Sequence, residues 1–248
     1  MTKQHPKRQA TRKALIFVSL LLLPITMNYL SPYVIIDGAF QGIINGSFVL
    51  FALLFVSALF VGRLWCGWLC PAGGMGEACF MISDKSARGG RFNWIKWAIW
   101  IPWVGIIAYG ALSAGGYTRI DLLHQTENVI SVDAPSRYII YYIVVGTVFV
   151  LSITAGKRAF CHYGCWMAPF MILGRKVRNR LKTPALHLQA DTDACIHCKT
   201  CTQACPMSLD VHALVQSESM ENSECILCGS CVDTCPKDVI RYAFNRQV

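Results

Sequence analysis

The alternation of hydrophobic and polar stretches divides the chain into two parts. Apolar residues dominate positions 14–156, whereas the remainder has the mixed composition of a water-soluble protein. Nearly uncharged apolar runs of about 20 residues predict helices that cross a membrane. The chain has four such runs, each near the lower length limit: 14–30, 46–61, 95–112 and 138–155.

The segments around these runs predict a coarse organisation. No small-residue cleavage site follows the first run, which indicates an uncleaved helix rather than a signal peptide. Residues 31–45 are weakly polar and predict an external loop or a re-entrant turn. Residues 166–182 mix apolar and basic side chains, as expected of an amphipathic helix on the membrane surface. A linker at 183–193 leads to the tail, so the predicted units are 1–165, 166–193 and 194–248.

The distribution of charge orients the predicted helices. Lys and Arg outnumber Asp and Glu by 23 to 14. All of the Lys and Arg residues except Arg119 and Arg137 lie before residue 14, within 62–96 or after 156. The positive-inside rule then predicts a multi-pass protein of the cytoplasmic (inner) membrane with both termini in the cytoplasm. Because the basic residues flank apolar runs, we interpret them as topology signals and expect no nucleic-acid partner.

The cysteines of the tail form a repeated motif. Thirteen cysteines at close spacings favour metal ligation over a disulfide framework. C-x2-C-x2-C-x3-C-P occurs twice and is typical of two-cluster bacterial ferredoxins, in which the fourth cysteine binds the other cluster. Zinc, which C-x2-C pairs also bind, is disfavoured by the two complete motifs with their prolines. We therefore expect two [4Fe–4S] clusters, the first bound by Cys195, Cys198, Cys201 and Cys235, the second by Cys225, Cys228, Cys231 and Cys205.

The predicted fold is mostly α, with a four-helix transmembrane domain and a C-terminal α+β two-cluster ferredoxin-like domain. Lys199 occupies the position that corresponds to Gly229 of the second motif, a difference expected to permit cluster binding. Apolar side chains near the motifs are expected to keep water from the clusters: Ile196, Leu209, Val211, Ile226, Val239 and Ile240.

Two C-x3-C pairs, each after a predicted membrane helix, form a second pattern. Cys66 and Cys70 follow the second run, and Cys161 and Cys165 follow the fourth, each pair after a basic residue and an aromatic residue. The similarity indicates an internal duplication that brings four thiols together at the cytoplasmic face. Three roles stay open for them: a shared additional metal centre such as an iron–sulfur cluster, dithiol or transient metal chemistry, and structural packing. Cys79 is expected to be an ordinary buried cysteine.

The stretch GRLWCGWLCPAGGMGE, together with the two tail motifs, resembles the NapH/NosR-type membrane-bound 4Fe–4S ferredoxin family. The resemblance covers residues 31–236. It implies electron transfer between quinone, cytoplasmic clusters and partner redox subunits. The second pair departs from the pattern because Trp166 replaces the proline, and the flavin-binding domain of NosR-type relatives is absent from this sequence.

The sequence thus predicts an electron-transfer subunit of an anaerobic respiratory or reductase complex rather than a stand-alone enzyme. Its expected partners are the membrane, other redox subunits and, as a candidate, quinone. The alternative is an assembly or metal-homeostasis factor that reduces a metal ion or a disulfide at the C-x3-C thiols. His162 could ligate or tune a centre at the second pair, and Arg119, Asp121, His124 and Glu127 of the outer loop could accept a proton from quinol, but we interpret all of them, and His197 within the first tail motif, as ordinary residues.

Overall fold

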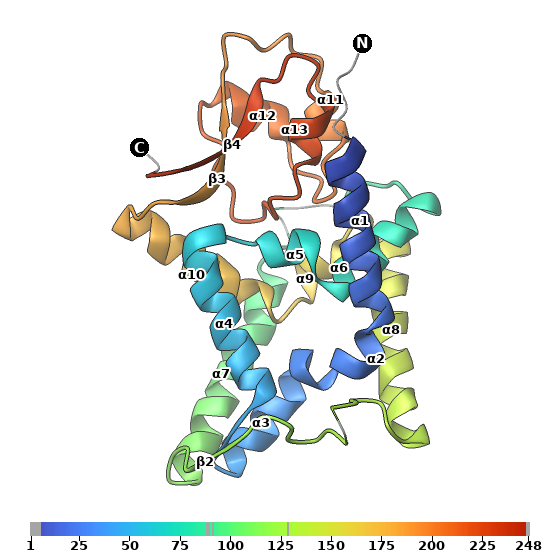
Figure 1. The fold of residues 1–248 in the computed structure, drawn as a ribbon, viewed down its shortest axis with the longest axis vertical. Helices are drawn as coiled ribbons and strands as arrows, with labels where there is room; N and C mark the ends of the chain where they lie inside the picture. Colours follow the sequence, from blue (N-terminus) through green and yellow to red (C-terminus); the bar gives the residue numbers. More distant parts are fainter. Residues whose placement is uncertain (1–5, 88–89, 91, 128, 247–248) are drawn as a thin grey trace.

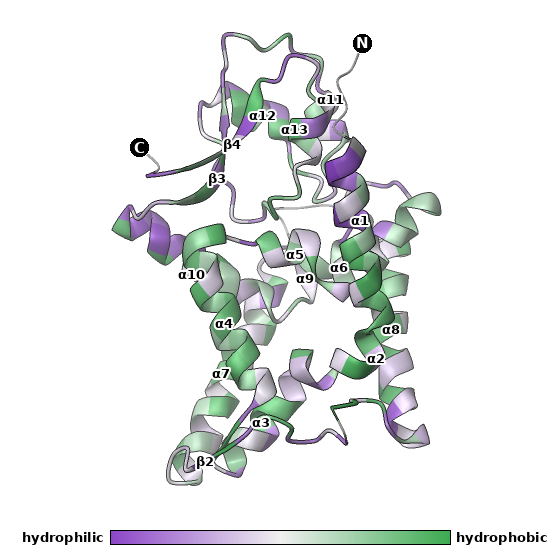
Figure 2. Ribbon diagram, viewed as in Figure 1, coloured by the Kyte–Doolittle hydropathy of each residue, from purple (hydrophilic) through white to green (hydrophobic). Residues whose placement is uncertain are grey.

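The computed structural model describes residues 6–87, 90, 92–127 and 129–246. The start of the basic N-terminal segment, residues 1–5, lies outside this range. Helices form an elongated lower body, and the cysteine-rich tail sits on one end of it (Figure 1). Apolar residues predominate in the helices of the lower body, whereas polar residues concentrate in the tail and at the ends of the helices (Figure 2).

Most of the described chain is helical. The longer helices are α1 (Pro6–Leu21), α3 (Pro32–Phe40), α4 (Gly46–Val61), α6 (Pro71–Ala78), α7 (Ile95–Ser113), α8 (Pro135–Thr154) and α10 (Ala168–Leu181). Short helices are α2 (Leu23–Thr26), η1 (Asn28–Leu30), α5 (Leu64–Trp68), η2 (Cys79–Met81), α9 (Ala159–Tyr163), α11 (Thr200–Gln203), α12 (Val211–Gln216) and α13 (Ser230–Thr234).

Two small sheets complete the fold. Strand β1 (Ile43–Asn45) pairs in parallel with β2 (Arg119–Asp121) at the end of the helical body far from the tail. Strand β3 (Ala185–Ala190) pairs antiparallel with β4 (Ile240–Asn245), with Ala185 opposite Asn245 and Ala190 opposite Ile240. Residues 183–193, expected to be a linker, therefore contain a strand whose partner is the last strand of the tail.

Among the described residues, two helices rather than four are long and apolar enough to cross a membrane: α7 and α8. The expected first span is interrupted after α1, where a separate short helix, α2, begins at Leu23. Pro24, in the first turn of α2, has no amide hydrogen with which to continue the hydrogen bonds of α1. Helix α4 has the expected bounds but only 16 residues, about 24 Å at 1.5 Å per residue, which is shorter than the hydrocarbon core. The expected four-span count is therefore corrected to two.

Segments predicted to be irregular or membrane-bound take other forms. Residues 31–45, expected to be a loop or a re-entrant turn, contain α3 and β1. The predicted helix at 166–182 corresponds to α10, but its apolar face packs on α4, where Gly174 lies against the Phe55 carbonyl. The neighbouring helix α4 therefore covers much of that face.

The tail has its own hydrophobic core. Val211, Ile226, Val239 and Ile240 are buried as predicted, and Leu209 is partly buried. Ile196 is 53% exposed, so the prediction that it shields a cluster is wrong. The first motif lies at the outer side of the tail, where its loop has solvent rather than the helical body beside it.

The second cysteine motif of the tail docks directly on the helical body. The Trp68 indole donates to the Leu227 carbonyl at 3.1 Å. A Cβ atom at Gly67 would lie 2.4 Å from the Ile226 carbonyl oxygen, so only glycine permits this approach. Helix α1 also contacts the second motif, since Arg8 forms an ion pair with the buried Asp233. These contacts fix the tail next to the segment that carries Cys66 and Cys70.

Candidate iron–sulfur sites

One tail ligand set is assembled as the swapped pattern predicts. A small cavity is lined by Cys205 from the first motif and by Cys225, Cys228 and Cys231 from the second. Each of these four thiols interacts electrostatically with the other three. Burial, with a smaller contribution from the neighbouring Cys228 and Cys225, raises the pKa of the Cys205 thiol to about 12. The surrounding side chains are largely apolar, which suits a group that must exclude water.

The other tail set is more open to solvent. Cys201 interacts electrostatically with Cys235, as expected for two ligands of one cluster. Cys198 is exposed, and its thiol lies 2.8 Å from the Thr200 hydroxyl, which lowers the pKa of the thiol. Cys195 lies within 4.8 Å of ring nitrogens of His197 and His212. The sequence analysis did not single out His212, because nothing in its spacing links it to the motif.

The backbone of the two motifs repeats the same rare conformations. Left-handed φ angles occur at His197 and Lys199 in the first motif and at the matching Leu227 and Gly229 in the second. Ser208 and Asp238, each three residues after the last cysteine of its motif, are also left-handed, both with φ of 51°. Alternation of right- and left-handed residues turns successive amides inward and forms an anion-binding concavity. Such a loop suits an anionic cluster.

Substitution of Gly229 tests this loop geometry. It has φ of 78°, and a Cβ atom there would lie 2.7 Å from the Tyr242 hydroxyl oxygen, which donates to the Leu227 carbonyl. Gly229→Ala should therefore lower the free energy of unfolding by about 2–3 kcal/mol, from left-handed strain and a disturbed hydrogen bond. Lys199→Gly, at the matching position, should change it by less than about 1 kcal/mol, because glycine removes strain there. Urea unfolding measures both, and equal stability of Gly229→Ala and wild type would contradict the geometry.

The two tail sets and the C-x3-C cysteines are neighbours in space, with the second tail set in the middle. Cys201 of the first set interacts electrostatically with Cys231 of the second. Cys228 of the second set belongs to the same buried core as the four C-x3-C cysteines. The second tail site therefore lies between the outer tail site and the helical body.

The two C-x3-C pairs come together as the sequence predicted. Cys66 lies in α5, Cys161 lies in α9, and each of the four cysteines is at most 4% exposed. Every thiol of the set, which also contains Cys70 and Cys165, interacts electrostatically with the other three. Burial, with smaller contributions from Cys161 and Cys66, raises the pKa of the Cys165 thiol to about 12. Metal binding there has to displace protons from the thiols.

Buried charges surround these thiols, and the sequence analysis missed them. Glu224 pairs with Arg63 (2.8 Å) and with Lys96. Burial opposes ionisation of Glu224, but these two cations hold the pKa of its carboxyl at about 2. Glu77 pairs with Arg12 at 2.7 Å and with Arg158 at 2.6 Å. The same basic residues had been interpreted as topology signals, because hydropathy does not distinguish a solvated charge from a buried one.

The ordinary interpretation of His162 and the loop residues agrees with their contacts. The ring nitrogens of His162 lie 3.1 Å from the Met207 carbonyl and 3.2 Å from the Asn93 side chain. Burial lowers the pKa of His162 to about 4, so the ring is neutral. In the far loop, His124 contacts Asp37 at 2.6 Å, while Arg119 and Asp121 lie in strand β2 and Glu127 in a turn bridge to Ile130.

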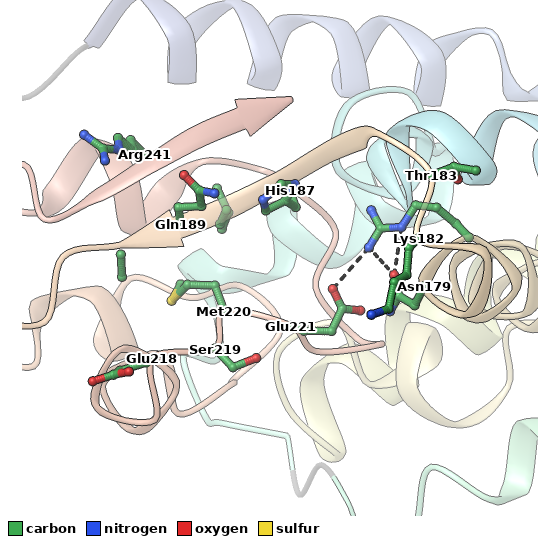
Figure 3. A pocket seen from close by; sticks show the side chains of 13 residues that line it. Asn179, Lys182, Thr183, His187, Gln189, Glu218, Ser219, Met220, Glu221 and Arg241 are labelled. Atoms are coloured by element: carbon green, nitrogen blue, oxygen red, sulfur yellow. Dashed lines mark hydrogen bonds and ion pairs between the residues drawn. The ribbon is translucent and has the colours of Figure 1, made fainter. Parts of the chain in front are cut away.

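Two of the cavities whose linings contain no cysteine bear on function. A polar cavity of about 540 Å³ lies between α10, β3 and residues 218–221 of the tail; Figure 3 shows that its lining contains no cysteine. An apolar cavity of about 310 Å³ is bounded by α1, α8 and residues next to the C-x3-C pairs. Its lining includes Pro71, Phe160 and Trp166, each adjacent in sequence to one of the buried cysteines.

Known families match both parts of the chain. Residues 178–240 match the family of 4Fe–4S dicluster domains. A second family, described as a 4Fe–4S binding domain, matches twice, at 44–88 and 139–184. Each of these two segments carries one C-x3-C pair, which agrees with the expected duplication. The chain therefore contains 4Fe–4S ferredoxin-type domains.

Curated relatives are distant but extend over most of the chain. A protein of Escherichia coli (strain K12) named for electron transport, YccM, is 25% identical over 80% of this chain and 57% of its own length. The methylamine utilization ferredoxin-type protein MauN of Methylobacillus flagellatus is 22% identical over 75% of this chain and 62% of its own length. An uncharacterized protein of Methanocaldococcus jannaschii is 23% identical over 77% of this chain and 76% of its own length. The chain thus spans little more than half of YccM. No solved structure matches it.

Proposed function

We propose that the chain is a membrane-bound iron–sulfur electron-transfer subunit, of the NapH/NosR type, that relays electrons between a cytoplasmic redox partner and the membrane. The observation that carries this proposal is the succession of three cysteine sets through one molecule. The outer tail set faces solvent, the second is buried, and Cys228 of the second shares a core with the C-x3-C cysteines. Electrons can enter at the exposed set and pass toward the helices.

The surfaces of α7 and α8 support insertion into a bilayer. Only 17% and 11% of the residues in their most apolar windows are buried, whereas a core helix of a soluble protein is mostly buried. Trp94, Trp97 and Trp100 lie at the N-terminal end of α7, which is the end nearer the tail. An interfacial aromatic belt is expected to have such a cluster. The segment that connects the two helices lies at the end of the body opposite the tail (Figure 1). With the positive-inside rule, this arrangement favours a cytoplasmic tail.

The proposal assigns the eight tail cysteines to two [4Fe–4S] clusters in the sets described above. Thiolates and inward-facing amides fit these groups, which supply one-electron transfer when bound. Quinone is a candidate acceptor or donor, and the apolar cavity beside the C-x3-C pairs has the chemistry that its ring and isoprenoid tail need. The alternative, metal delivery at the C-x3-C thiols, is disfavoured because exchange with solvent requires exposed thiols and these are buried.

Sealed membrane vesicles test the proposal. Dithionite does not cross membranes readily, so it should reduce the clusters in inverted vesicles, where the tail faces the medium. Right-side-out vesicles should give little reduced-cluster EPR signal until detergent is added. The protein should also stay in the membrane pellet after a carbonate wash. Release by carbonate, or equal reduction in both vesicle types, would contradict the proposal.

A further inference from the structure

The two matched repeats of the helical body each supply only half of a ligand set. A [4Fe–4S] cluster takes four cysteine ligands, and each repeat contributes two cysteines to the buried thiol group. The first repeat also contains Cys79, but burial alone shifts the pKa of that thiol. None of the four grouped cysteines interacts with it electrostatically. Neither repeat can therefore bind a cubane alone, whereas the two together present the required number.

The spacing of the four thiols suits a cluster better than a single ion. Four thiolates around one Zn²⁺ at about 2.3 Å would lie roughly 3.8 Å from one another. Within the described ranges, the only three-membered His/Cys/Asp/Glu group closer than 4.8 Å is that of Cys195 with two histidines. No three of the four buried thiols therefore lie within 4.8 Å of one another, and the same holds for the second tail set, although all six pairs interact. All four are free thiols.

Two buried arginines occupy matching positions around the thiols. Arg63 and Arg158 each precede the first cysteine of a pair by three residues, and both are at most 1% exposed. Each interacts electrostatically with cysteines of both repeats: Arg63 with Cys66, Cys161 and Cys165, Arg158 with Cys161 and Cys70. These interactions place the guanidinium groups at the shared thiol site rather than at either pair alone.

The arginines retain donors that the protein does not use. Arg63 Nε and Nη2 and Arg158 Nε are buried and have no hydrogen-bond partner in the part of the chain that the structure describes. An unused buried guanidinium donor is costly, since it loses water and gains nothing in exchange. Sulfide and thiolate sulfur of a bound cluster can accept such hydrogen bonds.

The net charge of the buried ion network also favours a bound iron–sulfur cluster. The buried network around the thiols contains four cations, Arg12, Arg63, Lys96 and Arg158, but only two carboxylates, Glu77 and Glu224. This leaves two buried positive charges in excess. A cubane with a 2+ core and four thiolates carries two negative charges, which matches the excess and makes the buried cations favourable.

From these features we infer that Cys66, Cys70, Cys161 and Cys165 jointly hold one [4Fe–4S] cluster between the two repeats, with Arg63 and Arg158 balancing its charge. The inference rests on the proposed electron-transfer function and gives it a third redox centre at the membrane face. The cluster would lie next to the second tail site, because Arg158 also interacts electrostatically with Cys228.

Iron and acid-labile sulfide analysis with EPR tests the inference without an activity assay. Anaerobically purified wild type should contain about twelve irons per chain, and Cys66→Ala and Cys161→Ala should each abolish the same third EPR signal. Cys79→Ala, which removes a buried thiol outside the group, should keep all three signals. Arg63→Gln should lower the reduction potential of the third centre alone, because it removes a positive charge that favours the reduced state.

The outcomes separate this inference from the proposed function. About eight irons in wild type, with both tail signals intact, would overturn the shared cluster and leave the tail relay standing. One zinc per chain that disappears in Cys66→Ala would overturn it too, as would different signals lost in Cys66→Ala and Cys161→Ala. Loss of iron from the tail of wild type as well would instead contradict the proposed function itself.

Discussion

Replacing Glu224 by glutamine is expected to lower the free energy of unfolding by about 3–5 kcal/mol. The Glu224 carboxylate lies between Arg63 and the Lys96 ammonium, and all three side chains are buried. Glutamine keeps the shape but leaves two uncompensated cations. Because Glu224 immediately precedes Cys225, the loss should also loosen the tail from the helical body. The loss corresponds to a decrease in Tm of roughly 6–20 °C for a chain of this size.

Thermal and urea unfolding of the detergent-solubilised protein measure this effect. Glu218→Gln is the matched control, because Glu218 is an exposed carboxylate of the same tail and its replacement should change stability by less than about 0.5 kcal/mol. Adding Lys96→Met to Glu224→Gln should recover part of the loss, since one unpaired cation is removed. A change below about 1 kcal/mol for Glu224→Gln alone would show that this ion network does not hold the tail.

Replacing Cys205 by alanine should abolish the same cluster signal as Cys231→Ala, although the two residues belong to different motifs. The four thiols of Cys205, Cys225, Cys228 and Cys231 line one cavity and interact with one another. Each variant should lose up to about four irons per chain, because a cubane that lacks one ligand is labile. Cys235→Ala should affect the other tail cluster, together with Cys198→Ala.

EPR and iron analysis of anaerobically purified variants measure the pairing of these signals. Cys79→Ala serves as the control, since it removes a buried thiol that lies in none of the cysteine sets. If Cys205→Ala matched Cys198→Ala in the signal it lost, each motif would bind its own cluster and the swapped ligand pattern would be wrong.

The sequence predicted those parts of the molecule that local patterns control. The cysteine spacings predicted which four thiols of the tail lie together around one cavity, and the repeated C-x3-C pairs predicted that four thiols meet. Runs of apolar residues located α4, α7 and α8 to within a few residues. These features depend on neighbours in the sequence, so spacing and hydropathy contain the necessary information.

Features that depend on tertiary contacts were missed or misjudged. Hydropathy overcounted the spans, because Pro24 ends the first apolar run as a helix. The amphipathic pattern predicted a helix at α10, but nothing local indicated that its apolar face packs on α4. The paired charges of Glu77 and Glu224 gave no local signal, since their partners lie between 65 and 161 residues away. Pairings over such distances follow only from the packed structure.

The most direct test of the central claim is the iron and acid-labile sulfide content of wild-type protein extracted from membranes without oxygen. The account predicts both elements in nearly equal amounts, at least about eight atoms of each per chain, since each cubane holds four of each. A membrane protein with zinc and no sulfide, or with neither metal nor sulfide, would contradict it.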